Sequence, residues 1–322
     1  MALNGLAIPA VIAAGALAAL VAVSYLVEAA RSAPTAPERL SWAPDLPVRY
    51  VGVEGVRLRY ITTGGGRPLV LLHTLRTQLD LFQKVIPDLA SRFQVYALDY
   101  PGHGYSDIPN TDYTPEFFVT SVTRFLEQLS IADAVIAGES IGGNIALVLA
   151  ARRNPRVRQA VAINPADYGA SRALRRSSTL ANLLFGLNDI PVLGPTVMRL
   201  RSYEVTKKIF EGGVYRKDAL PPGLAHEMYE VGNRRGHYRA FMSLVRHGPE
   251  WERARREYGN IVVPALLLYG DRDWSRPQER EYTARAIPGA RMEVLKDVGH
   301  FASLDAPQQV VRAILDFLGE AV

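Results

Sequence analysis

Short apolar runs alternate with amphipathic segments along most of this chain, a pattern typical of strands connected by helices. Most of the runs are rich in Val, Ile, Leu and Ala without a polar face, as expected for strands that are covered on both sides of a sheet. The expected strands are 48–53, 56–62, 68–72, 95–98, 134–137, 157–163, 261–269 and 292–295.

Helical periodicity fills most of the gaps between these strands. The expected helices are 79–89, 115–129, 141–152, one from about 277 and one over 305–317. Asp305 and Gln308 are spaced as a capping box at the start of the last helix. Glu54-Gly55 alone separates the first two strands and predicts an antiparallel hairpin. The later alternation predicts a mostly parallel sheet flanked by helices.

The strand pattern is interrupted for about ninety residues, from Ala166 to Tyr258. This segment contains several amphipathic stretches joined by Gly and Pro, which predict helices. Because the alternating pattern resumes at Ile261, we expect a helical cap inserted into one domain rather than a second domain. The predicted domain therefore covers 48–322, with its cap at about 166–258.

A stretch without charged residues runs from Leu6 to Val27. Its 22 residues, at about 1.5 Å each, can cross a hydrocarbon core of about 30 Å as a helix. The stretch lacks a preceding basic residue and exceeds the ~7–15 apolar residues of a secretory signal, which favours an uncleaved anchor over residues 1–31. Residues 32–47 contain four prolines and predict a semi-rigid tether.

Arginines follow the apolar stretch and none precede it, which favours a single-pass protein with a cytoplasmic catalytic domain. The alternative is an exported protein whose N-terminal stretch is removed as a signal. The chain of 322 residues has a net charge of +5 and a pI near 9.4. Its arginines are dispersed without interleaved aromatics, so we expect a solvated basic face and no nucleic-acid partner.

The absence of cysteine excludes disulfides, thiolate metal sites and a cysteine nucleophile. A different nucleophile is indicated at 138–142, where Gly-Glu-Ser-Ile-Gly follows an expected strand and precedes an expected helix. The flanking glycines permit a sharp turn that exposes the Ser140 hydroxyl, and the Ile141 amide at the helix N-terminus can stabilise a developing oxyanion. The alternative is a Gly-rich turn with an incidental serine.

A serine hydroxyl needs an imidazole to accept its proton and a carboxylate to orient that imidazole. Ser140, Asp273 and His300 each follow an expected strand, so parallel strands would bring them to one edge of the sheet. Asp271 and Asp167 are the alternative acids. The proposed chemistry requires neither a cofactor nor a metal ion.

With these features the chain resembles the α/β-hydrolase superfamily, in the cap-bearing branch of esterases, lipases and carbon–carbon hydrolases. The resemblance covers residue 48 to the C-terminus and includes the motifs at 99–107, 138–143, 270–273 and 299–301. It implies that Ser140 is the nucleophile, Asp273 the orienting acid and His300 the base. It also implies an oxyanion hole formed by the amides of Leu75 and Ile141.

The chain departs from the family at His73-Thr74, where relatives usually have His-Gly. This departure brings Arg76 near the expected pocket, where it could hold a substrate carboxylate or phosphate. The favoured alternative is a structural pair with Asp80 or with the loop 99–107. Trp274 and Phe301 are further candidate substrate-binding residues, because they directly follow the expected acid and base.

The expected function is hydrolysis of a hydrophobic or lipid-like carboxylic ester through an acyl-enzyme on Ser140. A serine at this position argues against epoxide or halide chemistry, which uses a carboxylate nucleophile. Thioester or carbon–carbon hydrolysis could use the same residues, and a non-catalytic binding or scaffold protein is the alternative of another class. The sequence does not indicate an oligomeric state.

Overall fold

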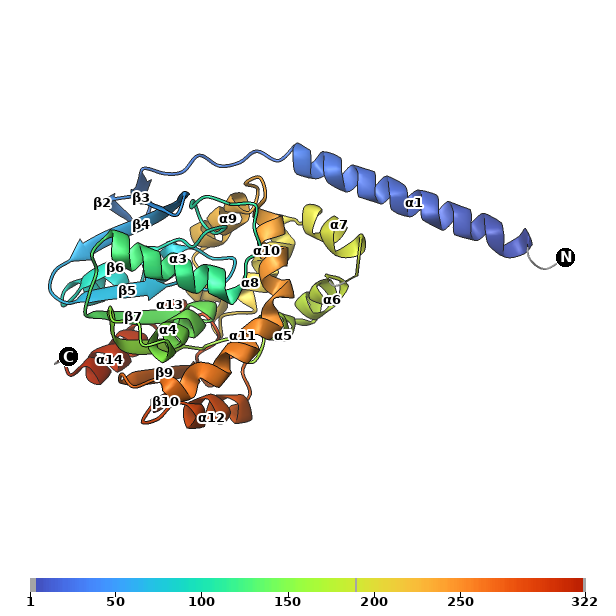
Figure 1. Ribbon diagram of the computed structural model, residues 1–322. Coiled ribbons are helices and arrows are strands. Elements are labelled where there is room, and N and C mark those ends of the chain that lie inside the picture. Colours follow the sequence, from blue (N-terminus) through green and yellow to red (C-terminus); the bar gives the residue numbers. More distant parts are fainter. Residues whose placement is uncertain (1–3, 189, 321–322) are drawn as a thin grey trace.

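The central feature of the fold is an eight-stranded sheet with the order β10-β9-β8-β7-β5-β6-β4-β3 (Figure 1). We describe a computed structural model, which covers residues 4–188 and 190–320. The strands are β3 Arg49–Val53, β4 Val56–Gly64, β5 Pro68–Leu72, β6 Gln94–Leu98, β7 Ala134–Glu139, β8 Val157–Ile163, β9 Ala265–Gly270 and β10 Arg291–Leu295. Only the β3–β4 and β4–β6 pairs are antiparallel, so the predicted mostly parallel sheet is confirmed.

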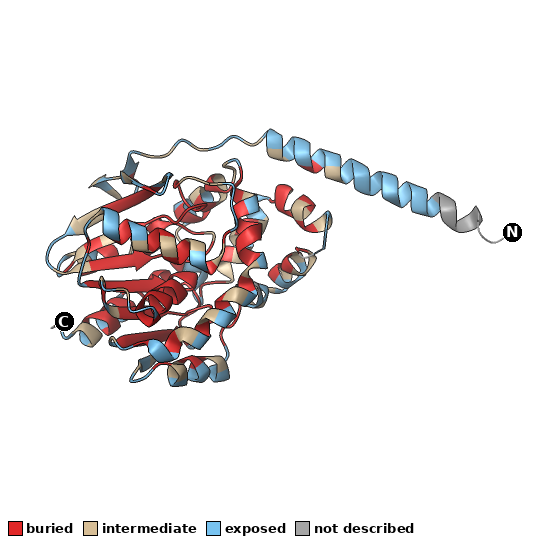
Figure 2. Ribbon diagram, viewed as in Figure 1, coloured by how far each residue is buried: buried red, intermediate tan, exposed pale blue. Residues whose placement is uncertain are grey.

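Helices cover both faces of the sheet, and the central strands are buried on both sides (Figure 2). In β5, Val70 and Leu72 face the core beneath α3 Pro115–Gln128 and α4 Ile141–Ala151. Leu69 and Leu71 face the opposite core, which includes α14 Pro307–Leu318. The period of two along a strand therefore divides a continuous apolar run between two cores.

Two local predictions were wrong. The expected helix at 79–89 is divided into a 3-10 helix, Leu79–Phe82, and α2, Ile86–Ala90. Pro87 explains the break, because a proline ring cannot continue a helix past its first turn.

The capping box at Asp305 does not form, because Ala306 is the N-cap of α14. A short helix, α13 Ala302–Asp305, precedes it. The Asp305 carboxylate instead accepts hydrogen bonds from the Tyr215 and Gly299 amides. It therefore ties two loops together rather than beginning a helix.

The segment between β8 and β9 forms a group of helices at one end of the sheet (Figure 1). They are α5 Ala170–Arg176, α6 Thr179–Leu187, α7 Leu193–Arg199, α8 Tyr203–Glu211, a 3-10 turn Lys217–Ala219, α9 Pro222–Val231, α10 His237–Arg246 and α11 Gly248–Ala254. The 3-10 helix Arg255–Asn260 leads back to β9, and α12 Pro277–Ala286 follows that strand. We call the segment 166–258 the cap.

The N-terminal helix α1, Asn4–Ala29, projects away from the rest of the chain and is exposed along nearly its whole described length (Figures 1 and 2). Its segment Pro9–Ala29 has a mean hydropathy of 2.4 and is long enough to cross a membrane. Only its last turns contact the cap, where Ser24 accepts a hydrogen bond from Arg199 and Glu28 pairs with Arg201.

The second half of the predicted tether is not free of structure. Strands β1 Arg39–Leu40 and β2 Ala43–Pro47 pair with each other. Leu40 is buried, and the Trp42 indole donates a hydrogen bond to Asp80. The two apolar side chains attach this segment to the domain despite its prolines.

A buried ion cluster joins the loops that follow β5 and β6. The Arg59 guanidinium, from β4, lies 3.2 Å from Asp80 and 3.1 Å from Asp99, and all three side chains are buried. Asp99 also accepts the amide hydrogens of Leu79 and Tyr105. One cation therefore compensates two carboxylates that hold both loops.

We predict that Arg59→Met destabilises the protein by about 3–5 kcal/mol, because two buried carboxylates lose their cation. Arg57→Met is the matched control, since Arg57 is on the same strand and its side chain is 61% exposed. That substitution should cost less than about 1 kcal/mol. Urea unfolding followed by circular dichroism measures both, and equal effects would show that the buried cluster contributes no special stability.

Candidate active site

Ser140 occupies a sharp turn between β7 and α4, with a positive φ of 60°. The turn requires close backbone contact, because a Cβ on Gly142 would collide with the Leu72 carbonyl. A Cβ on Gly138 would collide with the backbone of Gly142. Glycine at these two positions thus allows α4 to approach β5 and β7, and holds Ser140 in a conformation that L-residues rarely adopt.

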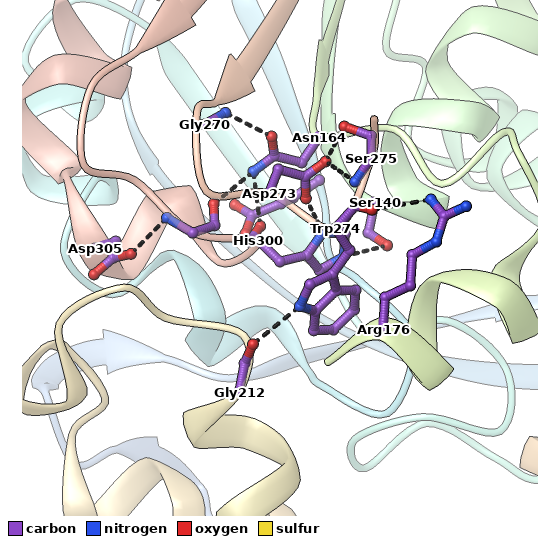
Figure 3. Close-up of polar contacts among 12 residues, drawn as sticks. Ser140, Asn164, Arg176, Gly212, Gly270, Asp273, Trp274, Ser275, His300 and Asp305 are labelled. Carbon is purple, nitrogen blue, oxygen red and sulfur yellow. Dashed lines mark hydrogen bonds and ion pairs between the residues drawn. The ribbon is translucent and has the colours of Figure 1, made fainter. Parts of the chain in front are cut away.

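The three residues expected at one edge of the sheet lie in a continuous hydrogen-bonded chain (Figure 3). The Ser140 Oγ is 2.9 Å from His300 Nε2, and His300 Nδ1 is 2.5 Å from Asp273 Oδ1. An ionised Asp273 can only accept, so Nδ1–H donates to it and Nε2 is left to accept from the Ser140 hydroxyl. This arrangement suits transfer of the hydroxyl proton to the imidazole.

The carboxylate of Asp273 is held in its charged form. Burial alone would raise its pKa, but the electrostatic interaction with His300 and hydrogen bonds from His300 and Ser275 outweigh burial and lower the pKa. The Ser275 amide donates to Asp273 Oδ2 at 2.9 Å, and the Ser275 hydroxyl donates to the same oxygen. Ser275 lies two residues after Asp273, and the sequence analysis did not identify it.

The alternative acids have other partners. Asp167 lies 3.6 Å from Arg255 and accepts a hydrogen bond from Thr283 at 2.8 Å. Asp271 accepts the amide hydrogen of Val298. Of the three aspartates considered, the structure places Asp273 against the imidazole.

Asn164 positions the loop that carries His300, and the sequence analysis missed it. Its side-chain nitrogen donates to the carbonyls of Gly299 and His300, while its oxygen accepts the Gly270 amide (Figure 3). It thereby connects the ends of β8 and β9 with the His300 loop. A polar residue directly after the buried run 157–163 was the available signal.

Trp274 and Phe301 lie beside the imidazole, as their sequence positions suggested. The Trp274 ring stacks on His300 with centroids 3.8 Å apart and an angle of 13°. Its indole N–H donates to the carbonyl of Gly212 in the cap (Figure 3). Phe301 contacts the Trp274 ring edge to face at 6.0 Å. These aromatics form one wall of a pocket between the cap and the sheet.

The loop after β5 orients the Leu75 amide. The Thr74 carbonyl is 2.7 Å from His73 Nδ1 and accepts a hydrogen bond from the Thr77 hydroxyl at 2.9 Å. The Tyr100 amide donates to His73 Nε2, and burial lowers the pKa of His73 to about 3, so the ring is neutral with its proton on Nδ1. In a trans peptide the Leu75 N–H points opposite to this anchored carbonyl. Thr74 stands where relatives usually have glycine, and hydrogen bonds to its carbonyl keep the loop fixed.

The structural partners predicted for Arg76 were wrong. Asp80 and Asp99 pair with Arg59 instead. The Arg76 guanidinium lies over the Phe241 ring at 4.7 Å, and its backbone has a positive φ of 58°. Arg76 therefore faces the cap rather than the ion cluster.

His103 is a buried residue of the loop that follows β6. Its Nδ1 lies 3.1 Å from the Pro101 carbonyl, and burial, together with the nearby His73, lowers its pKa to about 3. A buried neutral ring in this turn supports loop packing rather than proton transfer at neutral pH.

The pocket beside Trp274 is lined mainly by apolar side chains from the cap and the β5 loop. They include Leu75, Leu174, Phe185, Met198, Ile209 and Phe210. Arg76 and Arg201 are the two charged lining residues. The pocket is narrow, about 50 Å³, and Ser140 itself has no exposed surface. A substrate can therefore reach the hydroxyl only when cap side chains move.

Glu139, directly before Ser140, is buried and has one carboxylate oxygen without a hydrogen-bond partner in the described chain. The other oxygen accepts hydrogen bonds from the amide and hydroxyl of Ser303. Burial outweighs these bonds and raises the pKa of Glu139 to about 8. A neutral carboxylic acid consequently lies behind the Ser140 turn at neutral pH.

Comparison with known proteins identifies relatives across this domain. A family model described as the alpha/beta hydrolase fold matches residues 67–307. The uncharacterized hydrolase YugF of Bacillus subtilis strain 168 is 27% identical over 276 residues, which is 84% of this chain and 98% of YugF. The 2-hydroxymuconate semialdehyde hydrolase of Pseudomonas sp. strain CF600 is 26% identical over 283 residues, or 85% of this chain and 94% of that protein.

A solved structure of a bacterial membrane phospholipase A resembles this chain with a TM-score of 0.69 and 24% identity. The match covers 98% of this chain and 97% of that one. The uncovered share is much shorter than the 26 residues of α1, so the similarity extends into the N-terminal helix. The likeness establishes a shared fold.

We predict that Glu139→Gln removes part of the pH dependence of stability. Between about pH 4.5 and 8 the unfolded state loses the Glu139 proton while the folded state keeps it, so the contribution of Glu139 to stability falls as pH rises. The stability of Glu139→Gln relative to wild type should rise from pH 5 to pH 8 by at least about 1.4 kcal/mol, one pKa unit. Urea unfolding at both pH values measures this, with exposed Glu38→Gln as control. A difference that is independent of pH would contradict the assignment.

Proposed function

The chain belongs to the α/β-hydrolase family, and from this premise we propose that it hydrolyses carboxylic esters through an acyl-enzyme on Ser140. The observation that carries the proposal is the buried chain of hydrogen bonds from Ser140 through His300 to Asp273. Such a chain activates a hydroxyl that is otherwise a weak nucleophile.

In the proposed reaction the Ser140 Oγ attacks the ester carbonyl while His300 Nε2 takes the hydroxyl proton. Asp273 holds the imidazole and stabilises its charged form. The amides of Leu75 and Ile141 donate to the oxyanion of the tetrahedral intermediate. The intermediate expels the alcohol, which takes the proton from His300. Water then hydrolyses the acyl-enzyme by the same steps, with His300 again as base.

The apolar pocket favours a substrate with a hydrophobic acyl group. The similarity to a membrane phospholipase A, which includes α1, supports a lipid-like ester near a membrane. Carbon–carbon hydrolysis, suggested by the semialdehyde hydrolase, and thioester hydrolysis could use the same residues. A non-catalytic scaffold protein would hydrolyse none of these substrates, so activity assays distinguish the scaffold alternative from the enzymatic ones.

We predict that a fluorophosphonate probe labels Ser140 in the folded protein, and that Ser140→Ala abolishes labelling. Ser140→Ala should lower kcat for aryl esters by roughly 10³-fold or more, because the covalent route is lost. A chain-length series of aryl esters measures this activity. Full esterase activity in Ser140→Ala would contradict the proposal and favour the scaffold alternative.

The matched control for the orienting acid is a pair of Asp→Asn substitutions. Asp273→Asn should reduce kcat strongly, because an amide in place of the carboxylate no longer selects the reactive imidazole tautomer. Asp167→Asn removes a carboxylate whose partners are Arg255 and Thr283 rather than His300, so its kcat should change little. The reverse pattern would assign the orienting role to Asp167.

We also propose that α1 anchors the enzyme in a membrane as a single uncleaved span, with the catalytic domain on the cytoplasmic side. The support is its length, its hydropathy of 2.4 over Pro9–Ala29 and its exposure. The arginines that follow α1, with none before it, favour this orientation.

We predict that full-length protein stays in the membrane fraction after high-salt and alkaline washes and is released only by detergent. The chain contains no cysteine, so Glu38→Cys adds a single label site at an exposed position. A membrane-impermeant maleimide should label it only after cells are permeabilised. Release by salt would contradict the anchor, a mature N-terminus near Ala33 would indicate a cleaved signal, and labelling of intact cells would reverse the orientation.

A further inference from the structure

The narrow pocket beside Trp274 contains two guanidinium groups in a lining that is otherwise mostly apolar. Arg76 comes from the loop after β5, and Arg201 follows cap helix α7. Both lie near Gly232, at the end of α9. Whether either charge is available to a ligand depends on its other partners.

Arg201 is already neutralised. Its Nη1 lies 2.6 Å from the Glu28 carboxylate of α1, and the same nitrogen donates to the Met198 carbonyl. Its Nη2 donates to the Gly232 carbonyl at 2.6 Å. The anchor helix thus supplies the anion that balances this cation.

Arg76 has no such partner. Within residues 4–188 and 190–320, its guanidinium makes no hydrogen bond or ion pair, and it rests on the Phe241 ring. Burial, and then repulsion from Arg201, lower the pKa of Arg76 to about 9, which leaves it charged at neutral pH. The nearby rings His103 and His237 are buried, and burial lowers their pKa values, so both are neutral at neutral pH and neither can balance the charge of Arg76.

Arg76 is half-buried, so its guanidinium has lost part of its hydration without gaining a counter-ion. Its five donors in a planar fork match a carboxylate or phosphate. Resting on the proposed esterase function, we propose that Arg76 is the anion-binding residue of this pocket. The ester substrate then carries a carboxylate or phosphate group that pairs with the Arg76 guanidinium. Arg201 is not available for this role, because it already pairs with Glu28.

The chain position of Arg76 limits where the anionic group lies. Arg76 directly follows Leu75, whose amide is the proposed oxyanion donor. The anion is therefore held close to the scissile carbonyl, about one arginine side chain away. It can belong to the acyl part, as a carboxylate, or to the alcohol part, as a glycerol phosphate.

Two pairs of esters with equal acyl length distinguish these sources. 4-Nitrophenyl butyrate and 4-nitrophenyl hemisuccinate differ by a carboxylate on the acyl group. 1-Butyrylglycerol and 1-butyrylglycerol 3-phosphate differ by a phosphate on the alcohol. Full-length wild type in a nonionic detergent should prefer the anionic member of at least one pair in kcat/KM by about tenfold, and the pair concerned identifies the source.

Arg76→Met should abolish that preference by lowering kcat/KM for the anionic ester about 10- to 100-fold more than for the neutral ester. Arg76→Lys should restore part of it, because it keeps the charge but not the fork. Arg172→Met removes one exposed cap charge and controls for long-range attraction. Its ratio of anionic to neutral kcat/KM should equal that of wild type.

A binding measurement keeps the test independent of turnover. In a Ser140→Ala background, calorimetry should show that decanoate or inorganic phosphate binds at least tenfold more weakly when Arg76→Met is added. Equal wild-type kcat/KM within both ester pairs would overturn the proposal without any variant. So would an unchanged preference in Arg76→Met. Failure of the esterase proposal is distinct, because Ser140→Ala would then retain hydrolysis of neutral and anionic esters alike.

Discussion

The close approach of α4 to β5 and β7 is the constraint on which the rest of the site depends. Gly138 and Gly142 leave no room for a Cβ, so the backbone of the turn passes directly against Leu72 and its neighbours. That contact forces Ser140 to a φ of 60° and directs α4 with its N-terminus at the serine. The sheet edge, the Ile141 amide and the β5 loop are thereby brought together by one packing requirement.

The ion cluster and the orienting acid are each paired with groups of opposite charge or with hydrogen-bond donors, whereas the charged residue Arg76 in the pocket is not so paired within the described chain. Arg59 neutralises Asp80 and Asp99, and Asp273 is held as an anion by His300 and Ser275. Arg76 is the contrasting case, since its charge faces an apolar pocket. Among the described residues, other arginines without an ion pair, such as the buried Arg199 and Arg280, hydrogen-bond to neighbouring groups, whereas the Arg76 guanidinium rests only on the Phe241 ring.

The strand pattern and the order of Ser140, Asp273 and His300 could be predicted because they depend on local periodicity and on parallel strands ending at one edge. Contacts made across long sequence separations could not. Asn164 joins β8, β9 and the His300 loop, and Arg59 takes the carboxylates that had been assigned to Arg76. Competition among side chains for one partner is decided by packing, which a linear sequence does not reveal.

Helix α1 and Arg31 contact the cap directly. Under the proposed membrane attachment, these contacts would affect how the pocket opens. Arg31, just after α1, donates to Tyr229 and to the carbonyls of Arg199 and Arg201. Glu28 pairs with Arg201, which lines the pocket. A tilt of α1 in a bilayer would therefore act directly on the cap wall, with no flexible tether between them. Because Ser140 is buried beneath the cap, a change in the position of α1 and the opening of the pocket would involve the same cap residues, Arg199 and Arg201.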